Sequence, residues 1–166
     1  LIQIGDIHRI IGNYDKALKN YSAALKINEN EKRFSIGAYY RLGQLYFSDK
    51  NYQKALEHLG KYVDLRKEVL DKSPSLSALT LIALARKNSG KSYELKVIKE
   101  LINETDDIGY STYFRLYKLF DDFKYLKNAN EKLEDRANKL EESSKKKFFN
   151  YPIPKQIIEY QKNINS

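Results

Sequence analysis

The chain has 166 residues, of which 42% are hydrophobic and 31% charged, so it has the length and composition of one ordinary globular domain. It contains no cysteine and only two histidines, which excludes disulfides and thiolate chemistry and leaves no basis for predicting a metal or a cofactor. No apolar run is long enough to span a membrane and no signal peptide is recognisable, so we expect a cytoplasmic protein.

The first predicted element is a pair of helices over residues 1–30. Apolar residues recur at helical spacing in it, as with Tyr21 and Ala24 on the second helix. Gly5 on the first helix and Ala17 on the second are both small. Small residues at these places allow the two helices to cross closely, so we predict a tightly packed helix pair.

A second pair over residues 34–70 repeats the first at an offset of 38 residues. Gly43 then corresponds to Gly5, and Ala55 corresponds to Ala17. Similarity at a fixed period of this length is the signature of a stacked repeat protein, because one helix pair cannot bury its apolar face alone.

The third pair, over residues 76–104, matches the pattern least well. Its helices are predicted at residues 76–88 and 92–103. In this register Leu95 stands where the first two pairs have alanine. The prediction of this pair therefore depends mainly on spacing.

The fourth pair, over residues 108–144, follows the pattern again. Ala129 lies 74 residues, or two repeats, after Ala55, which requires one pair between them. The second helix of this pair is predicted to continue from Asn128 past Leu140. Residues 1–144 are thus expected to hold about four helix pairs.

Residues 145–166 are predicted to form a C-terminal capping segment. Prolines at positions 152 and 154 break the preceding helix before a short helix at residues 155–163. A terminal repeat needs a cap, because its last helix otherwise exposes the face that would pack on a further repeat. Phe148, Phe149 and Ile157 are among the side chains that can supply it.

This pattern resembles the tetratricopeptide repeat family, whose helix-turn-helix unit carries a Leu-Gly pair and an aromatic residue on its first helix and an alanine on its second. The resemblance covers residues 1 to about 140 and implies an all-α, right-handed α-solenoid of about four units with a C-terminal capping helix. The stretch from Leu133 to Pro152 is also similar to the closing segment of such arrays in large bacterial regulators. The chain does not begin with methionine, and its composition is typical of an AT-rich genome. We expect part of a longer bacterial regulatory or signalling protein.

The resemblance also implies where a partner binds, in the concave groove formed by the first helices. Counted from the family pattern, the inward positions of the second, third and fourth units are Tyr40, Arg41, Gln44, Phe47, Leu81, Leu84, Phe114, Arg115 and Lys118. These aromatic, aliphatic and basic side chains suit a peptide with apolar anchors and some acidic character. We expect a non-enzymatic protein-interaction module that binds a protein or peptide partner, or a neighbouring domain of the same polypeptide.

Two other functions remain open at this point. One is a peptide-sensing regulator that controls an attached DNA-binding or effector domain. The other is a nucleic-acid-binding α-solenoid, which the net charge of +8 favours and the spread of basic residues along the chain disfavours. A chaperone clamp is not expected, because the resemblance places Ile2 and Asp6 where such members hold a peptide carboxylate with Lys and Asn.

No motif supports an enzyme. Residues 89–92, Ser-Gly-Lys-Ser, match the end of a phosphate-binding loop, but Ala85 stands where that loop needs a glycine and a helix precedes it. His8 falls at a repeat position that is aromatic in the later pairs, and His58 has no recognisable nucleophile or second base around it. We expect both histidines to be structural.

Overall fold

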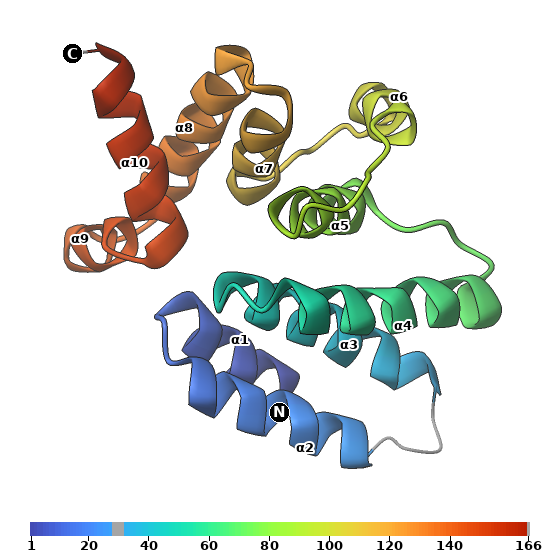
Figure 1. Cartoon of the computed structure of the whole chain (residues 1–166). Coiled ribbons are helices and arrows are strands. Elements are labelled where there is room, and N and C mark those ends of the chain that lie inside the picture. Colours follow the sequence, from blue (N-terminus) through green and yellow to red (C-terminus); the bar gives the residue numbers. More distant parts are fainter. Residues whose placement is uncertain (28–31, 166) are drawn as a thin grey trace. The chain divides into compact units, whose positions relative to one another are not determined.

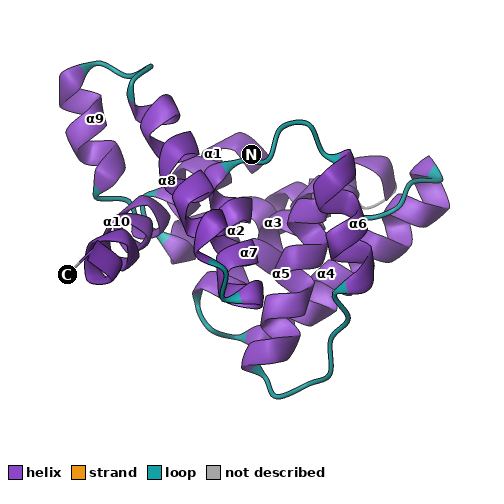
Figure 2. Cartoon of the chain, turned by 90° about the horizontal axis from the view of Figure 1, so that it is seen from above, coloured by secondary structure: helices purple, strands orange, loops and turns teal. Residues whose placement is uncertain are grey.

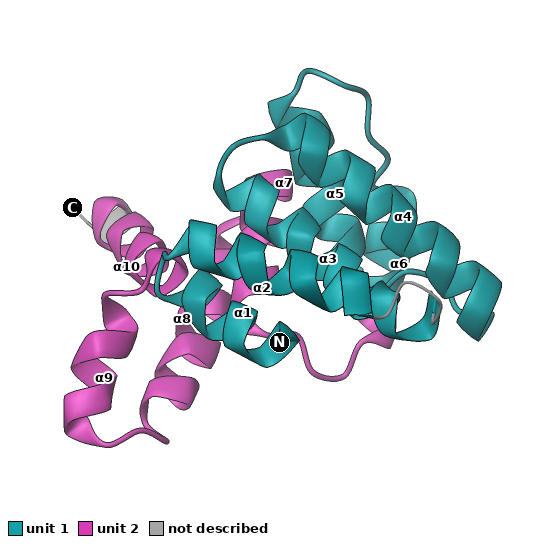
Figure 3. Cartoon of the chain, turned by 90° about the horizontal axis from the view of Figure 1, so that it is seen from below, with its two compact units in different colours: residues 1–101 teal, residues 102–166 magenta. Residues whose placement is uncertain are grey.

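The computed structural model describes residues 1–27 and 32–165, and within these ranges all regular structure is α-helical (Figures 1 and 2). The predicted all-α helical repeat is confirmed. The last residues of the first predicted pair, 28–30, lie outside the described residues. None of the described helices is both long enough and apolar enough to cross a lipid bilayer. The chain divides into two compact units, residues 1–101 (unit 1) and 102–166 (unit 2), coloured separately in Figure 3.

Unit 1 contains two packed helix pairs, followed by one further helix and most of another. Its helices are α1 (Ile2–Ile10), α2 (Tyr14–Ile27), α3 (Lys32–Ser48), α4 (Tyr52–Leu70), α5 (Leu76–Asn88) and most of α6 (Lys96–Glu104). The first helix of each of the first two pairs packs on its own second helix, α1 on α2 and α3 on α4. The pairs are stacked, because α2 contacts α3 and α4 contacts α5, and the first helices α1, α3 and α5 follow one another along one side.

Two glycines set the close crossings in this unit. A Cβ atom added at Gly5 would lie 2.5 Å from Cε1 of Tyr21, and one added at Gly43 would lie 2.5 Å from Cγ of Leu59. Both distances are far inside van der Waals contact. The first helix of each pair therefore approaches its second helix so closely that only a residue without a side chain fits there.

The predicted alanines lie in the core. Ala17, Ala55 and Ala129 are each fully buried. Between the first and second pairs, Leu42 and Leu45 join Ala17 in one apolar cluster, so the same alanine serves its own pair and the next one. This shared burial is what makes neighbouring repeats mutually dependent for stability.

Polar side chains determine where several helices begin. Oδ1 of Asn51 accepts a hydrogen bond from the Lys54 N–H at the start of α4, and Oγ of Ser75 accepts one from the Ala78 N–H at the start of α5. Each satisfies one of the backbone donors that a first helical turn leaves unpaired.

The third pair differs from its prediction. The second helix was expected from residue 92, but residues 91–95 are not helical and α6 begins at Lys96. Leu95 therefore does not take the place of the buried alanine, and Ile98 is the buried residue of α6. The alignment by spacing placed Leu95 where the other pairs have alanine, so no small residue marked the second helix of this pair.

Unit 2 holds the fourth pair and the C-terminal helices. Its helices are α7 (Tyr110–Phe120), α8 (Phe123–Ala137), α9 (Glu142–Phe149) and α10 (Pro152–Asn165). The turn between α7 and α8 uses the two adjacent aspartates: Asp121 has a φ of 54°, and the Asp122 carboxylate caps α8 by accepting from the Lys124 N–H. Capping, rather than acid–base chemistry, accounts for this acidic pair.

The C-terminal helices depart from the sequence prediction at their ends. The helix α8 stops at Ala137 instead of passing Leu140, and α10 begins at Pro152 instead of residue 155. Proline fits the first helical turn, because the N–H that it lacks would have no partner inside the helix. Helix α10 packs on α8 and α9, and Ile157 and Phe148 are buried.

Candidate protein-binding surface

A row of polar side chains lies on the first helices of unit 1. It begins at Asp6 on α1. One carboxylate oxygen, Oδ1, accepts a hydrogen bond from the Tyr21 hydroxyl at 2.8 Å and lies 2.8 Å from Nε of Arg41 on α3. Nε of Arg9 is 4.0 Å from the same oxygen. Three elements of the first two pairs are thus tied together at one carboxylate.

Asp6 is partly shielded from solvent. Its side chain is 22% exposed and that of Arg41 is 33% exposed, while the Tyr21 ring is fully buried. Burial, followed by the hydrogen bond to the carboxylate, raises the pKa of the Tyr21 hydroxyl well above its usual range. Tyr21 is therefore a permanent hydrogen-bond donor to Asp6 at physiological pH.

The row continues along α3. Nη1 of Arg41 donates to Oε1 of Gln44 at 3.2 Å, and Nε2 of Gln44 donates to the Tyr40 hydroxyl at 3.2 Å. The Tyr40 hydroxyl is also 2.7 Å from Oγ of Ser77 on α5. The polar contacts therefore pass from α1 through α3 to α5, and hold the three first helices in register.

Aromatic and cation–π contacts hold the side chains in the middle of the row. The Tyr40 ring packs on Tyr62 with centroids 5.2 Å apart, and the Arg41 guanidinium carbon lies 5.6 Å from the Tyr40 centroid. Both contacts restrict the rotamers of groups that remain partly accessible. We name this set the first-helix surface; it consists of Asp6, Arg9, Tyr40, Arg41, Gln44 and Ser77.

Phe47, the fourth predicted position on α3, lies away from this network. Its ring packs against Tyr52 at the start of α4, with centroids 5.6 Å apart, and is half-buried. It can contribute apolar area at the end of the first-helix surface, but it takes no part in the polar contacts.

The structure corrects the predicted positions on α5. Leu81 and Leu84 are each 2% exposed and belong to the interior, so they do not face a partner. Apolar residues line almost the whole circumference of α5, so its sequence does not show which side faces outward. Ser77, which the sequence analysis missed, is the α5 residue that meets Tyr40.

The three predicted positions on α7 are also less open than expected. Phe114 and Arg115 are buried, and Nη2 of Arg115 donates to Oγ1 of Thr112 at 3.0 Å. Lys118 is half-buried, with its ammonium 4.2 Å from the Phe114 ring centroid. These side chains already have partners within unit 2.

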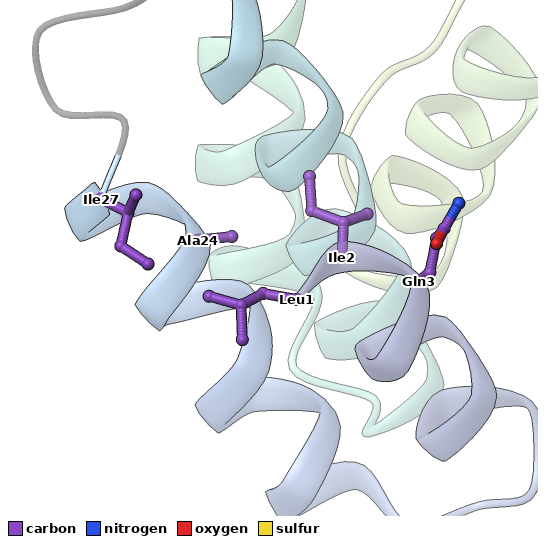
Figure 4. A pocket seen from close by; sticks show the side chains of 5 residues that line it. All are labelled: Leu1, Ile2, Gln3, Ala24 and Ile27. Atoms are coloured by element: carbon purple, nitrogen blue, oxygen red, sulfur yellow. The ribbon is translucent and has the colours of Figure 1, made fainter.

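A shallow hollow of about 390 Å³ lies between the start of α1 and the end of α2 (Figure 4). Its lining residues are Leu1, Ile2, Gln3, Ala24 and Ile27. None of them is titratable. The hollow offers apolar contact area but no chemistry for a reaction.

His58 lies between aromatic rings of α3. The His58 ring stacks on Tyr46 with centroids 5.2 Å apart, and it lies 6.0 Å from Tyr39. Burial lowers the pKa of His58 below its usual value, so the ring is neutral between the two tyrosines. In the part of the chain that the structure describes, no group of three or more His, Asp or Glu side chains is arranged to hold a metal ion.

Comparison with known proteins addresses the repeats directly. Residues 1–68 match the family model of the tetratricopeptide repeat. No curated protein and no solved structure gives a match to this sequence. Tetratricopeptide repeats generally mediate protein–protein interaction and are typically non-catalytic. With their glycine crossings and stacked helix pairs, residues 1–68 are similar to the tetratricopeptide repeat family.

Proposed function

We propose that this chain is a non-enzymatic interaction module in which the first-helix surface of unit 1 binds a peptide segment of a protein partner or of a neighbouring domain. The observation that supports it best is the continuous row of partly exposed, mutually oriented polar groups from Asp6 to Ser77. We further place it in the cytoplasm, within a larger bacterial signalling protein.

The chemistry of the row indicates the kind of peptide. Arg41 uses Nε for Asp6 and Nη1 for Gln44, and a guanidinium has five N–H donors, so donors remain for an acceptor on the ligand. A peptide carboxylate is the acceptor that pairs best with this fork. Tyr40 and Phe47 supply apolar contact on either side. The expected ligand has an acidic residue near an apolar anchor.

The same geometry disfavours nucleic acid as the ligand of this surface. Both of its arginines, Arg9 and Arg41, lie beside the Asp6 carboxylate. That carboxylate offsets part of their charge and would repel a phosphate backbone, whose binding depends on unpaired basic groups.

The test is selection of binding peptides from a displayed random library against the whole chain, followed by measurement of their affinities for two variants. Arg41→Gln removes the charge on the first-helix surface. Lys67→Gln removes the same charge from an exposed position on α4 and serves as the matched control. We expect the selected peptides to be acidic and to lose about tenfold in affinity, roughly 1.4 kcal/mol, with Arg41→Gln only. Equal binding to both variants would rule out this surface.

A further inference from the structure

Two side chains of α10 contact the face of α7 that corresponds to the first-helix surface. The Tyr160 ring lies 5.5 Å from the Phe114 ring, nearly perpendicular to it, and 5.6 Å from the Lys118 ammonium. One turn earlier on α10, Oε1 of Gln156 accepts a hydrogen bond from Nζ of Lys118 at 3.2 Å. Gln156 and Tyr160 thus engage α7 as an amide and an aromatic ring four residues apart.

The repeat pattern relates this contact on α7 to the first-helix surface of unit 1. With Ala129 aligned to Ala55, Phe114 occupies the position of Tyr40, and Lys118 occupies that of Gln44. Tyr40 and Gln44 belong to the row that we propose for ligand binding in unit 1. Helix α10 therefore contacts, in unit 2, the repeat positions that in unit 1 carry the proposed ligand-binding row.

We propose that the Phe114–Lys118 face of α7 is a binding site for a helix that presents an acidic residue and an aromatic residue four positions apart, and that α10 fills this site as a replaceable internal ligand. The proposal deepens the proposed function, because it takes the same repeat positions as a ligand-binding face.

The chemistry of Lys118 explains why α10 is replaceable. Its ammonium is half-buried between two rings, and burial lowers its pKa, which means that the charged form has lost favourable hydration. A carboxylate compensates a desolvated ammonium better than a neutral amide does. Helix α10 offers the amide of Gln156. A partner helix with Glu at the equivalent place would keep the aromatic contact and strengthen the polar one.

The whole chain can be tested with a defined probe. The probe is a fluorescein-labelled synthetic peptide of residues 150–165 that carries Gln156→Glu, and its binding is followed by fluorescence anisotropy. Tyr160→Ala in the chain removes the ring that holds α10 on α7. Glu159→Ala, on the exposed side of α10, is the matched control. We expect the probe to bind Tyr160→Ala at least tenfold more tightly than the control or the wild type.

Two further variants make the outcome decisive. Lys118→Met in the Tyr160→Ala chain should abolish binding, and binding that persists would overturn the proposal. If hydrogen exchange shows α10 still protected in Tyr160→Ala, the additional change Ile157→Ala removes a fully buried contact of α10 and releases it. Failure of the probe to bind this released chain, with helicity in unit 2 retained, would also overturn it.

The experiment is independent of the one proposed for unit 1. The first experiment is read on Arg41 of unit 1 and this one on Lys118 of unit 2, while Lys67→Gln at an exposed position of unit 1 should leave binding of the α10 probe unchanged. A failed peptide selection against the first-helix surface and a failed α10 displacement can therefore be told apart.

Discussion

The two units differ in how the first and second helices of a pair pack against each other. In unit 1, Gly43 brings α3 so close to α4 that Leu59 fills the space where a side chain would stand. At the matching repeat position of unit 2 the residue is Tyr117, a large ring buried among Phe114, Phe123 and Tyr160. The comparison teaches that the helix-pair framework tolerates either close approach or aromatic filling.

Whether the helices of a pair cross closely at a glycine or are separated by aromatic rings also affects the ligand-binding face. In unit 1 the side chains on the first helices remain partly exposed and bond to one another. In unit 2 the aromatic cluster includes Tyr160 of α10, whose ring contacts Phe114 and Tyr117 on α7. The predictions below test this contrast.

The largest effect is expected for Tyr117→Ala. Removing a buried aromatic ring leaves a cavity among three other rings and should cost about 3–5 kcal/mol in the free energy of unfolding of unit 2. Amide hydrogen exchange of α7 and α8 measures that loss separately from unit 1. A loss below about 1 kcal/mol would show that the ring is not part of the packing.

Gly43→Ala should also lower stability, here through overpacking instead of a cavity. The added methyl group collides with Leu59, and we expect a loss of about 1–3 kcal/mol in a urea unfolding experiment. Gly60→Ala is the matched control, because a Cβ at Gly60 in α4 meets nothing within 4 Å. That change should stabilise the helix by about 0.5–1 kcal/mol. Equal effects of the two variants would contradict the close crossing.

Asp6→Asn should weaken the row in unit 1. The amide cannot pair with Arg41 as a carboxylate does, and it accepts less strongly from Tyr21, so we expect a loss of about 1–2 kcal/mol. A double-mutant cycle with Arg41→Gln isolates the pair, and a coupling energy near zero would show that the two side chains do not interact in solution.

The smallest effect is a pH dependence from His58. Its pKa is lowered in the folded chain, mainly by burial and further by Lys61 and Lys54, while Glu57 acts in the opposite direction. Above its usual pKa of 6.5 the ring is neutral in both the folded and the unfolded chain, so its contribution to stability is complete. Below 6.5 the unfolded chain binds a proton first, and stability falls until the pH passes the folded-state pKa.

The expected loss is less than about 1 kcal/mol, because the ring is only partly buried. His58→Phe keeps the stacking on Tyr46 and removes the titration. Thermal unfolding midpoints of this variant and of the wild type, compared at pH 7 and pH 5, should diverge toward the lower pH. Parallel midpoints would refute the assignment.

Much of the candidate site was accessible from the sequence. Tyr40, Arg41 and Gln44 were predicted from their repeat positions, and the structure places all three in one network. Ser77 was missed, since its hydroxyl meets Tyr40 across 37 residues of chain and no motif marks such a pairing. Leu81 and Leu84 were misplaced because apolar residues surround most of α5, so periodicity does not show which of its sides faces outward.

The sequence by itself determined the first, second and fourth helix pairs, because apolar periodicity is a local property. It also determined the crossings at Gly5 and Gly43, because a small residue marks each of them. Only the tertiary structure decided that Asp6 pairs with Arg41 and that Gln156 reaches Lys118, 38 residues away. The physical reason is that a helix pattern reports which side of a helix is buried, whereas the partner of a polar group depends on how separate helices pack.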